Sequence, residues 1–328
     1  MIVIYHNRDF DGFCSAAIIR KRYPDTLPSN FIGWDYGMPF PDLKSIPFDT
    51  PIIIVDISFI DKDNPNPFWY MEALAKHSNN QITWIDHHIT TIKTYEEYIA
   101  NYAGTSWGKI CFNSSIAACE ATWWEMFPKI PMPKAVNYLG IYDTWRHAST
   151  PYWEETIYPF QLGLKTVCNS LETFPEYLLE DYVTIEELQN VAINDFFKDR
   201  DIPAPKPSTN DLLNSMVEKG ETILSYQRMQ NIARAKTSAF ERIFEGKRAI
   251  CMIGAIGANP FESVYDPSKH DIMLAASFQN ESWSISLYTS HDEIDVSKIC
   301  QRFGGGGHPK ASGFKIDDIN PILRGETV

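Results

Sequence analysis

Two short apolar runs, each followed by an aspartate, constrain the fold of this chain most strongly. Ile52 to Val55 is continuously apolar and precedes Asp56, and the run from Gln81 to Ile85 precedes Asp86. Continuous apolar runs of this length are typical of parallel strands that are buried on both faces. The segment between them, Phe68 to His77, has the pattern of a helix. A strand, a helix and a strand in this order predict a parallel α/β sheet.

The neighbouring segments continue the alternation. Ile2 to Tyr5 is a β-branched run, and helices are predicted at Phe13–Arg20 and from about Ser114 to Met126. In a parallel α/β sheet, functional side chains gather at the carboxyl ends of the strands. The polar residues at these predicted ends are His6, Asp56 and Asp86.

The second half of the chain has a different character. Residues 171–244 read as long, charged helices with a break at Pro203–Pro207, and the pattern from Lys247 onward is β-rich. Strands are predicted there at 248–253, 272–278 and 283–288. We therefore expect a parallel-sheet α/β domain at residues 1–165, a helical connector at 166–244 and a smaller α+β domain at 245–328.

The composition restricts the class of protein. The 328 residues are 44% hydrophobic and 22% charged, which is typical of a globular protein. We expect no signal peptide and no membrane contact, because no apolar run approaches the roughly 18 residues that span a bilayer. Six scattered cysteines without a C-x-x-C pair favour reduced thiols in a cytoplasmic protein over a disulfide framework or a zinc ribbon. The net charge of −13 argues against binding long duplex nucleic acid, but not against a small phosphorylated ligand.

Carboxylates and imidazoles accumulate around the predicted strand ends. The chain carries His6, Asp9 and Asp11 at the first strand, His87 and His88 directly after Asp86, and Asp143 after an apolar segment. Carboxylate and imidazole ligands together suit Mn²⁺ or a similar divalent ion, whereas thiolates would suit zinc. There are more ligands than one ion needs, which indicates a pair of ions about 3.5–4 Å apart.

Each of these residues also has an ordinary structural explanation. Asp9 and Asp11 suit helix caps, a single aspartate after a strand is usually a turn residue, and a pair of histidines is often incidental. Their joint occurrence at the strand ends favours the metal site.

A run of four glycines, Gly304 to Gly307, precedes His308 near the C-terminus. Four glycines are costly inside a helix or strand, so we expect a rigid turn whose amides and His308 receive the far end of a nucleotide. The alternative is a flexible linker. Three further residues are candidates for substrate binding: Lys310, Ser114 and Tyr288. Lys310 also suits a solvated surface position, and Ser114 a helix start.

These motifs resemble the DHH phosphoesterase superfamily, in the subgroup with a C-terminal DHHA1 domain and with oligoribonuclease-type (nanoRNase) members. The signature tripeptide is Asp86-His87-His88, and the stretch beginning at His6 resembles the first motif. Asp56 and Asp143 resemble the second and fourth motifs, and Phe303–Phe314 resembles the glycine–histidine motif of DHHA1. The resemblance covers both ends of the chain and leaves the connector unmatched.

The resemblance implies a role for each site residue. One ion would be held by His6, Asp9 and Asp56, and the other by Asp11, Asp56, His87 and Asp143. Asp86 would orient neighbouring ligands, and His88 would contact the scissile phosphate and protonate the leaving oxygen. The substrate-binding residues would be Gly305, Gly306, Gly307, His308 and Lys310, joined by Ser114 and Tyr288.

The resemblance also implies an activity. We expect a phosphodiesterase with two divalent ions, most simply Mn²⁺, that cuts short oligonucleotides or linear dinucleotides to mononucleotides. The alternatives are a cyclic-dinucleotide phosphodiesterase, a RecJ-type single-strand exonuclease and, outside the enzymes, a nucleotide-sensing module on a decayed scaffold. Whether the protein forms a homodimer is left open.

Overall fold

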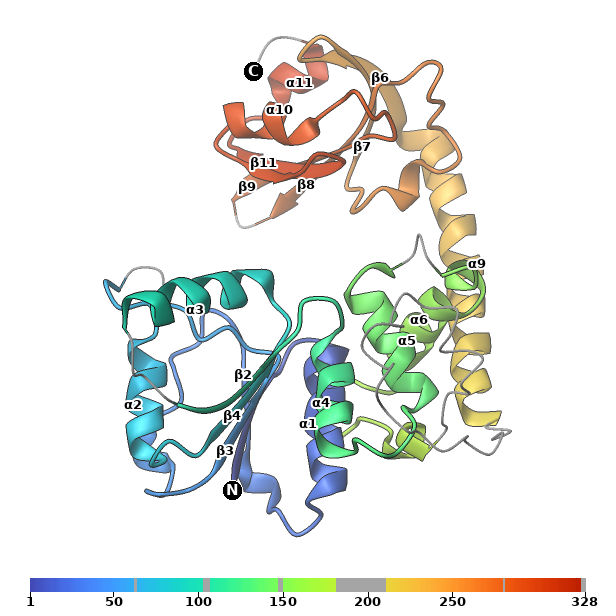
Figure 1. Cartoon of the computed structure of the whole chain (residues 1–328). Helices are drawn as coiled ribbons and strands as arrows, with labels where there is room; N and C mark the ends of the chain where they lie inside the picture. Colours follow the sequence, from blue (N-terminus) through green and yellow to red (C-terminus); the bar gives the residue numbers. More distant parts are fainter. Residues whose placement is uncertain (62–63, 103–106, 147–149, 181–210, 280, 326–328) are drawn as a thin grey trace. The chain divides into compact units, whose positions relative to one another are not determined.

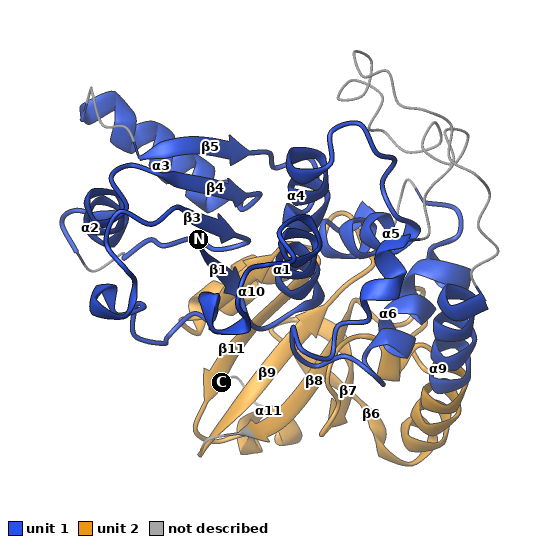
Figure 2. Ribbon diagram, turned by 90° about the horizontal axis from the view of Figure 1, so that it is seen from below, with its two compact units in different colours: residues 1–223 blue, residues 224–328 orange. Residues whose placement is uncertain are grey.

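The computed structural model describes residues 1–61, 64–102, 107–146, 150–180, 211–279 and 281–325. The proline cluster at 203–207 and much of the predicted connector lie outside these residues. The chain divides into two compact units, Met1–Ile223 and Leu224–Val328 (Figure 2). No helix in the described part of the chain is long and apolar enough to cross a membrane.

The first unit is built on a parallel five-stranded sheet in the order β2-β1-β3-β4-β5. Its strands are β1 (Ile2–His6), β2 (Phe31–Trp34), β3 (Ile52–Val55), β4 (Ile82–Asp86) and β5 (Gly108–Phe112). The parallel α/β fold predicted for this part of the chain is therefore confirmed, and so are its three predicted strands. The two edge strands, β2 and β5, are additional to the predicted ones.

Helices cover both faces of this sheet (Figure 1). They are α1 (Phe10–Arg22), α2 (Trp69–His77), α3 (Ile89–Asn101), α4 (Ala118–Met126), α5 (Lys134–Asp143) and α6 (Tyr158–Leu164). Alternate residues of β1 point to opposite faces of the sheet. Val3 and Tyr5 pack in the core with α1 and α4, whereas Ile2 and Ile4 pack in the core with α2 and α3. Burial on both faces explains why the strands read as unbroken apolar runs.

The second unit contains a mixed six-stranded sheet in the order β10-β11-β9-β8-β7-β6. Its strands are β6 (Ala239–Phe244), β7 (Lys247–Ile253), β8 (Ile272–Gln279), β9 (Ser282–Tyr288), β10 (Gly306–His308) and β11 (Ala311–Ile316). β7 and β8 are parallel and the other pairs are antiparallel. The helices are α9 (Asp211–Ser238), which begins in the first unit, α10 (Val296–Arg302) and α11 (Asn320–Arg324). The predicted α+β character is confirmed.

Two local predictions in this half are wrong. The predicted helical segment ends too late, because residues 239–244 form β6; Glu245 and Gly246 both have positive φ, at 50° and 72°, and close a tight hairpin into β7. The glycine run is not a turn throughout, because Gly306 and Gly307 belong to the edge strand β10. A side chain at Gly307 would lie 2.7 Å from the carbonyl oxygen of Ala311, so close strand pairing requires glycine there.

Candidate metal centre

The carboxyl ends of three neighbouring strands carry the predicted polar residues. His6 is the last residue of β1, Asp86 is the last of β4, and Asp56 follows β3. Asp56 has φ of +59°, in the left-handed region that non-glycine residues seldom adopt. Its backbone nitrogen donates a hydrogen bond to the Ile85 carbonyl oxygen at 3.0 Å, which holds this turn against β4. Strained conformations of this kind cluster at functional sites.

The start of α1 brings a second set of carboxylates to the same edge. Asp9 caps α1, because its Oδ1 accepts a hydrogen bond from the backbone nitrogen of Gly12 at 3.0 Å. A Cβ atom at position 12 would lie 2.0 Å from the carbonyl oxygen of His6. Glycine therefore allows the helix to begin directly against the end of β1, which places Asp11 beside the strand ends.

The first candidate ligand group consists of His6, Asp9 and Asp56. His6 Nδ1 lies 3.0 Å from Asp9 Oδ2 and 3.3 Å from Asp56 Oδ2. The other ring nitrogen of His6, Nε2, lies 3.3 Å from Asp35 Oδ1. Asp35 is not among the predicted site residues, because it follows β2, a strand that no pattern in the sequence indicates.

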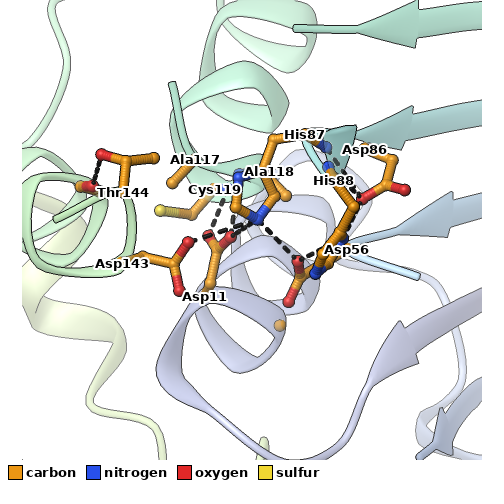
Figure 3. A network of polar contacts seen from close by, with 12 residues as sticks. Asp11, Asp56, Asp86, His87, His88, Ala117, Ala118, Cys119, Asp143 and Thr144 are labelled. Atoms are coloured by element: carbon orange, nitrogen blue, oxygen red, sulfur yellow. Dashed lines mark hydrogen bonds and ion pairs between the residues drawn. The ribbon is translucent and has the colours of Figure 1, made fainter. Parts of the chain in front are cut away.

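The second candidate group consists of Asp11, His87 and Asp143 (Figure 3). His87 Nε2 lies 3.5 Å from Asp11 Oδ2 and 3.3 Å from Asp143 Oδ2. It also lies 3.4 Å from Asp56 Oδ1. The two oxygens of Asp56 thus face different groups, Oδ2 toward His6 and Oδ1 toward His87. This arrangement suits a carboxylate that bridges two ions.

The carboxylates of the second group are held in an unfavourable electrostatic environment. Burial and the charge of Asp56 raise the pKa of Asp11 to about 7. Burial and the charge of Asp11 raise the pKa of Asp143 to about 7. Burial also raises the pKa of Asp56. Divalent cations would relieve this repulsion, so the chemistry of the donor set fits a metal centre.

The same carboxylates raise the pKa values of the two imidazoles. Burial alone would lower the pKa of His6, but hydrogen bonds to Asp56 and Asp9 raise it to about 10. Burial would likewise lower the pKa of His87, which Asp56 and Asp11 raise to about 10. Without metal, two protons therefore supply the positive charge that the acids require, and a metal ion would displace them.

Asp86 and His88 form a pair beside these groups, and His88 also belongs to a third possible ligand group with Asp56 and His87. Asp86 is fully buried, and its Oδ1 lies 2.7 Å from His88 Nδ1 and accepts a hydrogen bond from the His87 backbone nitrogen at 2.9 Å. The side chain of His88 remains 34% exposed. Burial would lower the pKa of His88, but Asp86 raises it. The contacts suit the predicted role of Asp86 in orienting its neighbours.

A buried ion pair supports the end of α5, where Asp143 lies. Glu120, in α4, is fully buried, and its Oε2 lies 2.5 Å from Arg146 Nη2. Arg146 Nε donates a hydrogen bond to Thr144 Oγ1 at 2.7 Å. A Cβ atom at Gly140 would lie 2.3 Å from Glu120 Oε2, so glycine permits α5 to approach α4 closely. This pair fixes the turn that follows Asp143.

The predicted substrate-binding residues of the second unit are gathered around β10 and β11. Exposed His308 pairs with Ala311, and Lys310 Nζ lies 2.8 Å from Asp292 Oδ1. Tyr288 ends β9 and packs against a hydrophobic cluster of that unit. In the first unit, Ser114 is exposed and does not cap α4, whose N-cap is Ala117. The substrate-binding roles of these residues stay predictions.

Known proteins offer limited similarity to the chain. No protein-family model matches it. A 34-residue segment, 10% of the chain, is 65% identical to oligoribonuclease NrnB of Bacillus subtilis strain 168, and the match spans 8% of that protein's length.

Among solved structures, pGpG-specific phosphodiesterase PggH from Vibrio cholerae is 12% identical, with 99% of this chain and 96% of that chain covered and a TM-score of 0.47. RecJ from Thermus thermophilus, solved with Mn²⁺, is 14% identical, with 98% of this chain and 50% of RecJ covered and a TM-score of 0.35.

Proposed function

We propose that this chain, which resembles the DHH phosphoesterases, is a metal-dependent phosphodiesterase that hydrolyses short oligonucleotides or linear dinucleotides to mononucleotides. The observation that carries the proposal is the placement of Asp56 between two ligand groups, with one oxygen toward His6 and the other toward His87. Paired divalent ions are a recurrent solution for hydrolysing phosphodiesters.

The residues that would hold two ions are those of the two groups. His6, Asp9 and Asp56 suit one ion, and Asp11, Asp56, His87 and Asp143 suit the other. When bound, such ions supply Lewis acidity toward water and phosphate oxygens. The mixture of carboxylates and imidazoles favours Mn²⁺ over an all-oxygen ion such as Ca²⁺.

His88 is the residue that we propose to move a proton. Its Nδ1 is engaged by Asp86 Oδ1 at 2.7 Å, so the imidazole is held in one orientation and Nε2 is left for the substrate. Because Asp86 raises the pKa of His88, the ring retains a proton that it can donate to the leaving oxygen. Asp86 stays a positioning group throughout.

The charge of the chain favours short substrates. At a net charge of −13 the surface offers little excess positive charge for a long phosphate backbone. Binding energy must then come from contacts close to the scissile phosphate. We therefore propose a substrate of about two to five nucleotides, with little gained from further length.

The test is hydrolysis of a substrate panel with Mn²⁺, before and after chelation. The panel contains linear dinucleotides, longer single strands and cyclic dinucleotides. We expect the highest kcat/KM for linear dinucleotides and loss of hydrolysis with EDTA. Rising efficiency with strand length would favour a RecJ-type exonuclease instead. Bound metal without hydrolysis of any substrate would favour a nucleotide sensor.

A further inference from the structure

A cavity of about 350 Å³ opens beside the second ligand group, within the first unit. Asp11 and Asp143 form part of its wall, so it is continuous with the candidate metal centre. The remaining wall comes from the start of α1, from α5 and from the segment around the end of α6. This volume lies within the range of about 300–1,000 Å³ that is typical of small-ligand pockets.

Two cations on this wall have no acidic partner among the described residues. Arg8 and Lys165 both line the cavity and both are exposed. In a chain with a net charge of −13, two such cations at the edge of a metal centre point to an anionic ligand.

The cavity also contains a buried donor that lacks a partner. Gln161 is only 2% exposed, and its Nε2 makes no hydrogen bond within the described part of the chain. Buried amide groups are nearly always hydrogen-bonded, so one that lines a cavity indicates a ligand. Phe10 and Tyr142 contribute aromatic rings to the wall of the same cavity. Cations, an amide donor and aromatic rings together suit a nucleotide better than a simple anion.

We propose that this cavity binds the nucleotide next to the scissile phosphate, with the further phosphate of that nucleotide at Arg8 and Lys165. The proposal rests on the proposed function and specifies which substrates the centre prefers. The further phosphate is either a terminal phosphomonoester or the next phosphodiester of a longer strand. A substrate that contains the scissile phosphate alone leaves both cations without a ligand.

Lys165→Ala tests the proposal without touching a candidate metal ligand. The matched control is Lys129→Ala, which removes another exposed lysine, one that does not line the cavity. Each variant is assayed on four substrates: a dinucleotide with two terminal hydroxyls, the same dinucleotide with a 5′-phosphate, the same with a 3′-phosphate, and an unphosphorylated trinucleotide.

We expect Lys165→Ala to lower kcat/KM about 10-fold on a substrate with a second phosphate, the lower end of the range for a hydrogen bond to a charged group. The unphosphorylated dinucleotide should change less than about 2-fold, and Lys129→Ala should change nothing. The two phosphorylated dinucleotides and the trinucleotide distinguish a terminal phosphate from an internal one. An equal loss on all four substrates, or no loss on any, would overturn the proposal.

A binding measurement separates this proposal from the proposed function. Isothermal titration calorimetry with a nucleoside 3′,5′-bisphosphate, which carries a second phosphate and no diester to hydrolyse, should give a Kd about 10-fold weaker for Lys165→Ala than for Lys129→Ala. Gln161→Met keeps the side-chain length. It should lower the affinity for the nucleotide but leave the affinity for inorganic phosphate unchanged. If the native protein hydrolyses no substrate yet binds the nucleotide through Lys165, only the proposed function fails. If the Kd values agree, the cavity assignment fails.

Discussion

Asp56→Asn is the most direct test of a two-ion centre. The substitution keeps the size of the side chain and suits the left-handed backbone, where φ is +59°, because asparagine tolerates that conformation well. It removes the charge that faces both ligand groups, His6 at 3.3 Å and His87 at 3.4 Å. The variant therefore tests the loss of the carboxylate charge while the backbone conformation at position 56 is kept.

The expected loss of activity follows from the contacts of Asp56 with His6 and with His87. Loss of even an indirect partner of a metal ligand typically costs 10- to 100-fold in affinity or activity. Asp56 serves two groups, so the product of the two losses predicts a fall of about 10³-fold in kcat/KM. Metal-induced stabilisation should vanish as well. A site with free ion at 100 times its Kd gains about 2.7 kcal/mol in the native protein.

The chain offers a matched control for this experiment. Asp49 also has φ of +59°, is exposed, and accepts a hydrogen bond from Gln81 Nε2 at 2.9 Å away from the candidate centre. Asp49→Asn should leave metal content, thermal shift with Mn²⁺ and kcat/KM as they are. Two bound ions and near-normal turnover in Asp56→Asn would refute the bridging assignment.

Three further predictions concern other residues of the chain. His88→Ala should lower kcat while metal content, measured by mass spectrometry, stays intact, whereas His87→Ala should lower metal content itself; equal loss of metal would reverse these roles. Glu120→Gln should destabilise the protein by about 3–5 kcal/mol in urea unfolding, because it removes the buried carboxylate charge that offsets the charge of Arg146; a change below about 1 kcal/mol would contradict this. His308→Ala should raise KM for a dinucleotide more than it lowers kcat, and a pure kcat effect would remove His308 from binding.

The central strands of the first sheet could be predicted because they are buried on both faces. β3 and β4 read as apolar runs, and each run ends beside a polar side chain that belongs to the candidate centre. The edge strands carry no such signal. β2 contains Gly33, and β5 begins with the exposed pair Gly108 and Lys109. Edge strands bury less surface, so their sequences are less constrained.

Whether a site residue can be predicted likewise depends on whether a local sequence pattern marks its position. Asp11 and His87 lie in local motifs whose spacing is visible in the chain. Asp35 is not predicted, because β2, the strand that positions it, is not predicted either. Lys165 and Gln161 line the same cavity as Asp11 and Asp143, and no spacing in the sequence links them to Arg8. Long-range packing of this kind leaves no periodic pattern to detect.

Asp11 combines a structural role at the start of α4 with its proposed role as a metal ligand. Its two oxygens accept hydrogen bonds from the backbone nitrogens of Ala118 at 2.9 Å and Cys119 at 2.6 Å, the first residues of α4. The N-cap of that helix, Ala117, has no oxygen in its side chain, so Asp11, 107 positions before Ala118, satisfies the helix start. The same oxygen that binds Ala118 lies 3.5 Å from His87 Nε2. The carboxylate therefore fixes α4 to α1 and faces the candidate metal centre at once. A ligand anchored by two backbone donors loses little freedom when an ion binds, which is the preorganisation that tight metal binding requires.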